Sequence, residues 1–163
     1  MEKDELLDTV DKKITRYLLF VVCCFLFISG CSLPRIIILD DPLTPEEHIN
    51  LGVAYEKKGD LDHAIEEYGK ASKKLPIAYL YLGNAFMVKG DTGEAEGYYR
   101  KAIKKQRDLA DAYNNLAWLL YTKGENLEEA ESLALKALQL APAREDYRDT
   151  LNKIREVKYN KRQ

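Results

Sequence analysis

The sequence predicts an all-α protein, a solenoid of three helical hairpins followed by one further helix, and three observations predict it. One pattern of apolar and small residues recurs three times after residue 44, with its first two copies 31 residues apart. Within each copy the apolar residues fall at i, i+3, i+4 and i+7, the spacing of an amphipathic helix. Each copy is divided by a glycine followed by an acidic residue, which is typical of one helix ending and another beginning.

The composition limits the classes of protein to consider. The 163 residues are 46% hydrophobic, enough for one domain with a core, and the net charge of −2 gives no polyelectrolyte basis for binding nucleic acid. All three cysteines, Cys23, Cys24 and Cys31, lie in the first fifth of the chain. The rest of the chain therefore offers neither a disulfide framework nor a cysteine metal site.

The three copies place the same kinds of residue in the same order. The first holds His48, Leu51, Gly52, Tyr55, Ala64, Tyr68, Ala71 and Pro76, the second Tyr79, Leu82, Gly83, Phe86, Ala95, Tyr99 and Ala102, and the third Tyr113, Leu116, Ala117, Leu120, Ala130, Ala134, Ala137 and Pro142. This pattern resembles the tetratricopeptide repeat, whose consensus contains an aromatic residue, Leu-Gly, Tyr, Ala, Phe, Ala and Pro. The resemblance covers 45–143 and implies repeats at about 45–75, 76–109 and 110–143.

Capping residues support these boundaries. Thr44-Pro45-Glu46-Glu47 combines an N-cap threonine, a proline at the first helical position and a glutamate at N3, so the domain is expected to start there. Two further pairs have capping-box spacing, Asp91 with Glu94 and Asn126 with Glu129. Glycines 59, 90 and 124 are the predicted C-caps of the first helices.

Three departures from the repeat are expected to change local helix angles. Gly52 and Gly83 are 31 residues apart where the repeat has about 34, which predicts a tightened turn near Leu75-Pro76. The third copy has one extra residue near Asn126 and a small residue, Ala134, where the repeat has a large one.

Residues 144–163 are predicted to form a capping helix and a basic tail. One side of this helix is apolar, with Tyr147, Leu151, Ile154 and Val157, and a solenoid needs such a helix to cover its last repeat. Its end is basic, with Lys153, Arg155, Lys158, Lys161 and Arg162. Two interpretations of this charge stay open, a solvated helix end whose cations suit the C-terminus or a contact with anionic lipid or an acidic partner.

The first 30 residues resemble a bacterial lipoprotein signal peptide. Lys12, Lys13 and Arg16 precede an apolar run too short to cross a bilayer comfortably, and Ile28-Ser29-Gly30-Cys31 resembles a lipobox. The resemblance implies cleavage before Cys31 and a covalent lipid on its thiol, with no other cofactor. The acidic residues ahead of the basic flank fit a signal peptide poorly, so translation starting further in, for example at Val10, is a hypothesis. The alternatives are an uncleaved membrane anchor and a buried apolar helix.

Residues 31–44 are predicted to be a lipidated arm between the membrane and the domain. The arm contains Ile36-Ile37-Ile38-Leu39, which is more apolar than a simple spacer. It is expected to pack on its own domain, on the bilayer surface or on a partner's strand edge. Ser32 follows the lipidation cysteine, which resembles outer-membrane lipoproteins facing the periplasm. In an organism with one membrane the same protein is expected on the outer face.

The residues give no constellation for catalysis, so the protein is predicted not to be an enzyme. His48 takes the aromatic position of the first repeat and is predicted to pack, and His63 is predicted to be exposed. Neither a phosphate-binding loop nor a metal-ligand spacing is found in the sequence. The carboxylates of Glu66-Glu67 and Glu128-Glu129 are predicted to lie on solvated helix faces.

The resemblance implies a concave groove lined by the first helix of each repeat, where family members bind an extended peptide or a helix. The predicted partner-binding residues are Ile49, Val53, Leu80, Asn84, Met87, Asn114, Trp118 and Tyr121. Asn84 and Asn114 are expected to hydrogen-bond a ligand's backbone while Trp118, the only tryptophan, contacts its side chains. The alternative is that these side chains fill a tight superhelix or pack against the arm.

Some family members clamp a C-terminal carboxylate with Lys, Arg and Asn. Those positions hold Ile49, Val53, Asp111 and Asn115 here, so a carboxylate clamp is not expected. The predicted function is a membrane-anchored, periplasmic scaffold for protein–protein interaction in envelope assembly, such as pilus, secretion or outer-membrane machinery. The alternatives are a self-associating structural lipoprotein and an adaptor of an envelope hydrolase.

Overall fold

The computed structural model describes residues 14–21, 41–161 and 163, and the chain divides into two compact units, Met1–Asp40 and Asp41–Gln163. In the first unit, residues 14–21 are helical and exposed. The predicted lipidation site Cys31 and the segment Ile36–Leu39 lie outside the described residues. None of the helices in the described ranges is long and apolar enough to cross a membrane.

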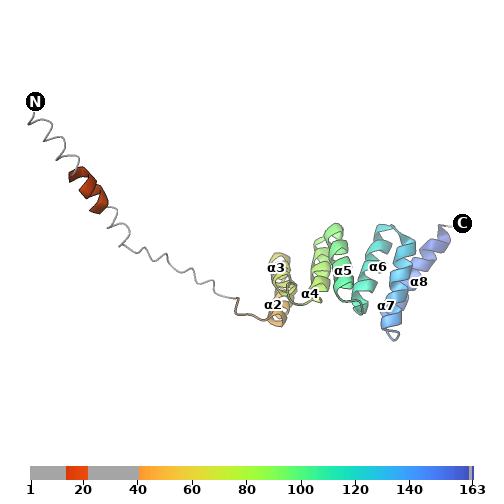
Figure 1. The fold of residues 1–163 in the computed structure, drawn as a ribbon. Helices are drawn as coiled ribbons and strands as arrows, with labels where there is room; N and C mark the ends of the chain where they lie inside the picture. The colour runs from red at the N-terminus through yellow and green to blue at the C-terminus, as the bar shows by residue number, and fades with distance from the viewer. Residues whose placement is uncertain (1–13, 22–40, 162) are drawn as a thin grey trace, which may run out of the picture. The chain divides into compact units, whose positions relative to one another are not determined.

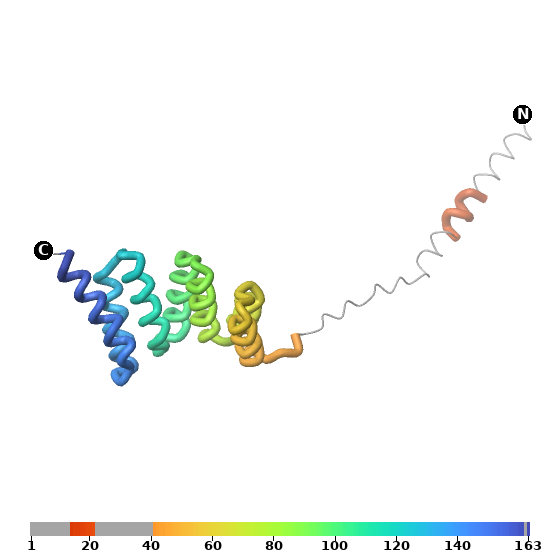
Figure 2. The backbone as a smooth tube through the Cα atoms, turned by 180° about the vertical axis from the view of Figure 1, so that it is seen from behind, coloured from red at the N-terminus to blue at the C-terminus, as the bar shows by residue number. Residues whose placement is uncertain are grey.

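The second unit consists of seven helices and, across the range described, contains no strand. The helices are α2 (Pro45–Lys57), α3 (Leu61–Ala71), α4 (Ala78–Lys89), α5 (Thr92–Lys105), α6 (Ala110–Lys123), α7 (Leu127–Leu140) and α8 (Glu145–Asn160). Each helix packs against the next, so α2–α3, α4–α5 and α6–α7 form three hairpins in a row, with α8 beside α7 (Figures 1 and 2). This arrangement confirms the predicted solenoid with a terminal capping helix.

Local capping explains where the first helix begins. Glu47 N–H donates to Thr44 Oγ1 at 3.2 Å, and Thr44 N–H donates to Glu47 Oε2 at 2.7 Å, which completes the predicted capping box. Only half of the second predicted box forms. Asp91 Oδ1 accepts from Glu94 N–H at 3.1 Å, but the Asp91 N–H is already bonded to the Phe86 carbonyl at 2.9 Å. The end of α4 therefore uses the donor that the box would need.

The prediction that Asn126 caps α7 through its side chain is wrong. Asn126 has a left-handed backbone, with φ of 44°, and its side chain makes no capping hydrogen bond. The cause is the extra residue in this turn. Gly124 already takes the left-handed C-cap position of α6, with φ of 69°, so the following residues must reverse the chain before α7 can start.

The two helices of each hairpin cross closely where the sequence has small residues. A Cβ atom added to Gly52 would overlap the Tyr68 ring, and one added to Gly83 would overlap the Tyr99 ring. The third hairpin combines Ala117 with Ala134, both fully buried. The third hairpin thus has one more methyl group on α6, at Ala117, and a smaller side chain on α7, at Ala134. Packing at the crossing explains why Ala134 departs from the large residue of the repeat.

The shorter first repeat is explained by a shorter helix. Helix α3 has 11 residues, whereas α5 and α7 each have 14. The prediction of a tightened turn near Leu75-Pro76 is therefore wrong, because the connection from α3 to α4 still spans residues 72–77. The three residues that the first repeat lacks are therefore missing from the last turn of α3.

The core follows the repeat pattern and ends under α8. The leucine that precedes the crossing glycine or alanine is buried in the second and third repeats, with Leu82 2% and Leu116 1% exposed. On α8, Tyr147, Leu151 and Ile154 are 1%, 5% and 0% exposed. These values confirm the predicted apolar face of the capping helix.

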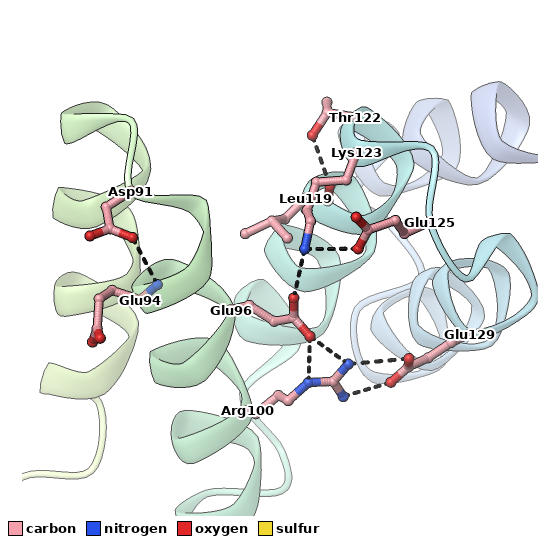
Figure 3. Close-up of polar contacts among 9 residues, drawn as sticks. All are labelled: Asp91, Glu94, Glu96, Arg100, Leu119, Thr122, Lys123, Glu125 and Glu129. Carbon is pink, nitrogen blue, oxygen red and sulfur yellow. Dashed lines mark hydrogen bonds and ion pairs between the residues drawn. The ribbon is translucent and has the colours of Figure 1, made fainter.

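Ion pairs join consecutive hairpins (Figure 3). Glu96 on α5 accepts from Lys123 on α6 at 3.2 Å, and the Arg100 guanidinium lies 2.6 Å from Glu129 on α7. The Glu96–Lys123 spacing of 27 residues recurs in the pair of Glu131 and Lys158, at 2.7 Å. Partly exposed pairs of this kind contribute about 0–1 kcal/mol each, so we interpret them as fixing the register between repeats.

Candidate partner-binding groove

An open depression of about 340 Å³ lies where α4, α5 and α6 meet. It is lined by Asn84, Met87, Val88, Tyr99, Asn115 and Trp118. None of these side chains carries a charge at neutral pH. The depression is therefore suited to an uncharged group that offers both apolar surface and hydrogen bonds.

Three polar side chains on its floor form one connected network. The Tyr99 hydroxyl donates to Asn84 Oδ1 at 3.0 Å, and Asn115 Nδ2 donates to the same oxygen at 2.9 Å. Gly83 makes the first of these bonds possible, because only a residue without a Cβ lets the Tyr99 ring cross α4 here. Burial raises the pKa of the Tyr99 phenol above its ordinary value of 10, so the hydroxyl stays protonated even at alkaline pH.

The walls of the depression are apolar and aromatic. Val88 is 65% exposed and lines the depression together with Met87 and Trp118. The Trp118 ring lies with its centroid 5.2 Å from that of Tyr121, and Lys153 Nζ lies 4.9 Å from the Trp118 centroid. Trp118 thus connects the depression to Lys153 on α8.

The structure brings together three of the predicted groove residues. Asn84, Met87 and Trp118 all line the depression, with Tyr121 next to Trp118. The second amide in the depression belongs to Asn115. Asn114, which was predicted for this role, is partly buried, and its Oδ1 is buried with no hydrogen-bond partner in the described part of the chain.

The remaining predicted groove residues lie elsewhere in the packing. Ile49 and Val53 pack, partly buried, against the core of the first hairpin. Leu80 is 7% exposed and belongs to the core around α5 and α6. The depression is thus built from the second and third repeats.

Buried tyrosines hold polar side chains at two other places in the same way. The Tyr68 hydroxyl donates to Glu56 Oε2 at 2.7 Å, and the Tyr147 hydroxyl donates to Asp111 Oδ1 at 2.5 Å. In each case burial, followed by the hydrogen bond to the carboxylate, raises the pKa of the tyrosine. Sequence reasoning missed this pattern because the hydroxyl partners lie at different positions of their helices.

A separate polar cluster joins α2 to α3. His48 is 4% and Glu67 7% exposed, and His48 Nδ1 lies 2.5 Å from Glu67 Oε2, while its Nε2 lies 3.1 Å from Asp41 Oδ2. Burial raises the pKa of Glu67, but hydrogen bonds from Lys70 and His48 outweigh it and hold the pKa below its ordinary value. The prediction that Glu67 is solvated is therefore wrong, because the buried imidazole needs a partner.

Several of the other charged groups singled out in the sequence have structural partners in the described part of the chain. His63 is exposed, as predicted, and stacks on Tyr55 at 5.1 Å. On α8, Arg155 and Lys158 both contact Glu131 at 2.7 Å, so part of the basic end holds α8 against α7. Within the described residues, no group of His, Cys, Asp and Glu side chains could hold a metal ion.

Comparisons with known proteins agree with this fold. Residues 45–77 and residues 80–145 each match a family model described as tetratricopeptide repeat, and together they cover more than half of the chain. No curated protein sequence matches the chain.

Solved structures with a similar fold include domains that hold peptides. The first tetratricopeptide domain of Spaghetti (RPAP3), bound to the HSP90 peptide SRMEEVD, is 24% identical with a TM-score of 0.66, over 74% of this chain and 97% of that chain. The second such domain of human RPAP3, in complex with the HSP70 peptide SGPTIEEVD, is 22% identical with a TM-score of 0.60, over 68% and 98%. The domain of Arabidopsis OM64 is 21% identical with a TM-score of 0.64, over 69% and 95%. At these identities the likeness shows the fold.

Proposed function

Because this chain belongs to the tetratricopeptide repeat family, we propose that it is a scaffold for protein–protein interaction that binds a segment of a partner protein between α4 and α6. The observation that carries the proposal is the uncharged depression with Trp118 at its wall and an amide network on its floor. Similar domains, those of Spaghetti and human RPAP3, are bound to peptides, which supports a peptide or a helix as the occupant.

The partner of this chain belongs to a different chemical class from those two peptides, which both end in Glu-Glu-Val-Asp. Such a segment is acidic and needs cations in the groove. Asp111 on α6 is held by Tyr147 and paired with Arg144 at 3.4 Å, and Ile49 and Val53 on α2 are apolar, so none of these positions supplies a cation. The depression itself offers no cation, so it favours an uncharged segment.

The proposal includes a lipid anchor on Cys31 and a location in the cell envelope, at the outer membrane facing the periplasm. Its support is the lipobox-like Ile28-Ser29-Gly30-Cys31. Two tests are direct. Mass spectrometry of the mature N-terminal peptide should find a lipid on Cys31, and Cys31→Ala should move the protein out of the membrane fraction. An unmodified Cys31 within an intact N-terminus would contradict the anchor.

The scaffold is proposed to act in envelope assembly, as part of pilus, secretion or outer-membrane machinery. The test is chemical crosslinking and affinity capture from intact envelopes, followed by mass spectrometry. The baits are wild type, Cys31→Ala and the double variant Trp118→Ala with Asn84→Ala, each checked for helicity by circular dichroism. A partner captured by wild type and lost from the double variant supports the proposal. Equal capture by a folded double variant would place the binding surface elsewhere.

A further inference from the structure

Lys153 on α8 lies at the edge of the depression, against the tryptophan that forms part of its wall. Its Nζ lies 4.9 Å from the centroid of the Trp118 ring, and Trp118 lines the depression. Lys153 itself is exposed. The same ring therefore has an uncharged depression beside it and an ammonium over one of its faces.

The other cations in this part of α8 hold the helix in place. Arg155 and Lys158 both contact Glu131 on α7 at 2.7 Å. Lys153 differs from them, because it makes no ion pair with any residue that the structure describes. Its charge is thus not used to attach α8 to the solenoid.

Lys153 lies over Trp118 although carboxylates stand close to it in the sequence. Asp149 and Glu156 are four residues before it and three residues after it on α8, at the spacing at which helical ion pairs form. Neither pairs with Lys153 in the described structure. The aromatic ring therefore sets the position of the ammonium, and its charge stays open to a carboxylate from another protein.

We propose that the partner segment carries one acidic side chain next to the uncharged residue that enters the depression, and that Lys153 selects it. This inference rests on the proposed function. The carboxylate pairs with the Lys153 ammonium beyond Trp118, outside the depression, so the residues inside the depression stay uncharged. A lysine or arginine at the same place in the partner would face a like charge, which disfavours such segments.

Contact with Trp118 prepares Lys153 for this pairing. An exposed lysine loses rotamer freedom when it forms an ion pair, which is one reason why such pairs contribute little. The cation–π contact already restricts the side chain. Because a single ring separates the depression from the ammonium, and an extended chain advances about 3.3 Å per residue, the acidic residue lies within about three residues of the one in the depression.

Exchange of the charge at position 153 tests the inference. Lys153→Glu reverses the charge, and Lys153→Met keeps much of the aliphatic stem without it. The matched control is Lys101→Glu on α5, because Lys101 is also exposed and its Nζ also lies over an aromatic ring, 4.6 Å from the Tyr98 centroid. Neither Lys101 nor Tyr98 lines the depression. Circular dichroism checks that each variant is folded.

The probe is a phage-displayed library of short random segments, flanked on both sides by constant sequence and selected on the full chain in detergent. Wild type should enrich segments with an aromatic or aliphatic residue and an Asp or Glu at a constant spacing from it. Lys153→Glu should enrich Lys or Arg at that spacing, and Lys153→Met should show no charge preference there. Lys101→Glu should select the same segments as wild type.

Titration of selected segments gives the size of the effect. The segments are synthesised with both ends blocked, and the fluorescence of Trp118 is followed. Replacing the acidic residue by its amide should weaken binding to wild type about threefold, and less at high salt, since salt screens exposed charges. The same replacement should strengthen binding to Lys153→Glu, because it removes a like charge.

The outcomes separate this inference from the proposed function. If binding is lost with Trp118→Ala while wild type and Lys153→Glu select segments of the same charge, the groove binds partners and the role of Lys153 is overturned. If Lys101→Glu shifts the preference equally, the overall charge of the domain selects the segment, and the inference is overturned as well. If no library segment shows binding that depends on Trp118, both the groove function and the role of Lys153 are contradicted.

Discussion

At the scale of single residues, the fold depends on pairs whose sizes are matched across each hairpin. Tyr99 lies over Gly83 and Tyr68 over Gly52, whereas the third hairpin has an alanine on each helix. Protein interiors are packed so densely that one methyl group matters at such a crossing. The pairs therefore set how close the two helices can lie.

Gly83→Ala should destabilise the protein by about 1–3 kcal/mol, because the added Cβ overlaps the Tyr99 ring. In a Tyr99→Ala background the same change should cost much less, since the obstructing ring is gone and the crossing resembles that of Ala117 and Ala134. Urea unfolding of wild type, the two single variants and the double variant gives the coupling free energy between positions 83 and 99. Equal costs in both backgrounds would mean that Tyr99 does not limit the crossing.

The buried pair of His48 and Glu67 should make stability depend on pH. The pKa of Glu67 lies below its ordinary value of 4.5, so its charged form contributes stability above that pH, and the contribution is lost as the pH falls through the folded-state pKa. Glu67→Gln should lower stability at pH 7 by about 2 kcal/mol and flatten the decline between pH 5 and 3. Melting curves of wild type and Glu67→Gln across this pH range test the prediction. If both proteins lose stability equally as the pH falls, Glu67 is not the source of the pH dependence.

Asn114 carries a buried acceptor that nothing in the described residues satisfies. An unsatisfied buried polar atom costs about 1–3 kcal/mol, so Asn114→Leu, with a similar volume, should raise the free energy of unfolding by about 1 kcal/mol. Asn115→Leu is the comparison, and it should lower stability because Asn84 loses a donor. A destabilised Asn114→Leu protein would show that the oxygen has a partner.

At the scale of elements, α8 closes the last hairpin. Ile154 is fully buried, so Ile154→Ala should lower the free energy of unfolding by about 2–5 kcal/mol. Glu156→Ala, at an exposed position of the same helix, is the control and should change stability by less than about 0.5 kcal/mol. Thermal unfolding of both variants measures the difference, and similar melting temperatures would mean that α8 is not part of the cooperative unit.

The sequence allowed these elements to be predicted where the determinants are local. The Thr44 box, the left-handed glycines and the apolar face of α8 each depend on residues within one or two turns. The prediction for Asn126 was wrong because the preceding C-cap sets the backbone of this residue. The short α3 was not predicted because the spacing between repeats does not show which element has fewer residues.

The candidate site could be predicted only in part. The positions of Asn84, Met87 and Trp118 in the depression follow from their place in the repeat. Asn114 and Asn115 point about 100° apart around the helix, so an assignment that is wrong by one residue selects the buried Asn114 and not Asn115, which lines the depression. Glu67 and Tyr99 acquire their roles from partners on another helix, at separations of 19 and 15 residues. Pattern within one helix carries no information on such pairs.

At the scale of the whole molecule, the domain of Asp41–Gln163 is a row of hairpins, and the candidate binding depression is built from its second and third repeats. The depression uses α4, α5 and α6, while α2 and α3 add the His48–Glu67 cluster and α8 adds the ion pairs to Glu131. The first repeat and the last helix therefore close the two ends of the solenoid, and the proposed partner site lies between them.

The central claim is that a partner segment lies between α4 and α6. The measurement that tests it most directly is site-specific photocrosslinking in intact cells, with a photoreactive residue at Val88 and, as the matched control, at Leu135 on α7. Both positions are exposed, at 65% and 45%. A discrete crosslinked protein at Val88, absent at Leu135 and lost when Trp118→Ala is added, is the predicted result. Equal crosslinking at both positions, or products that persist without Trp118, would contradict the claim.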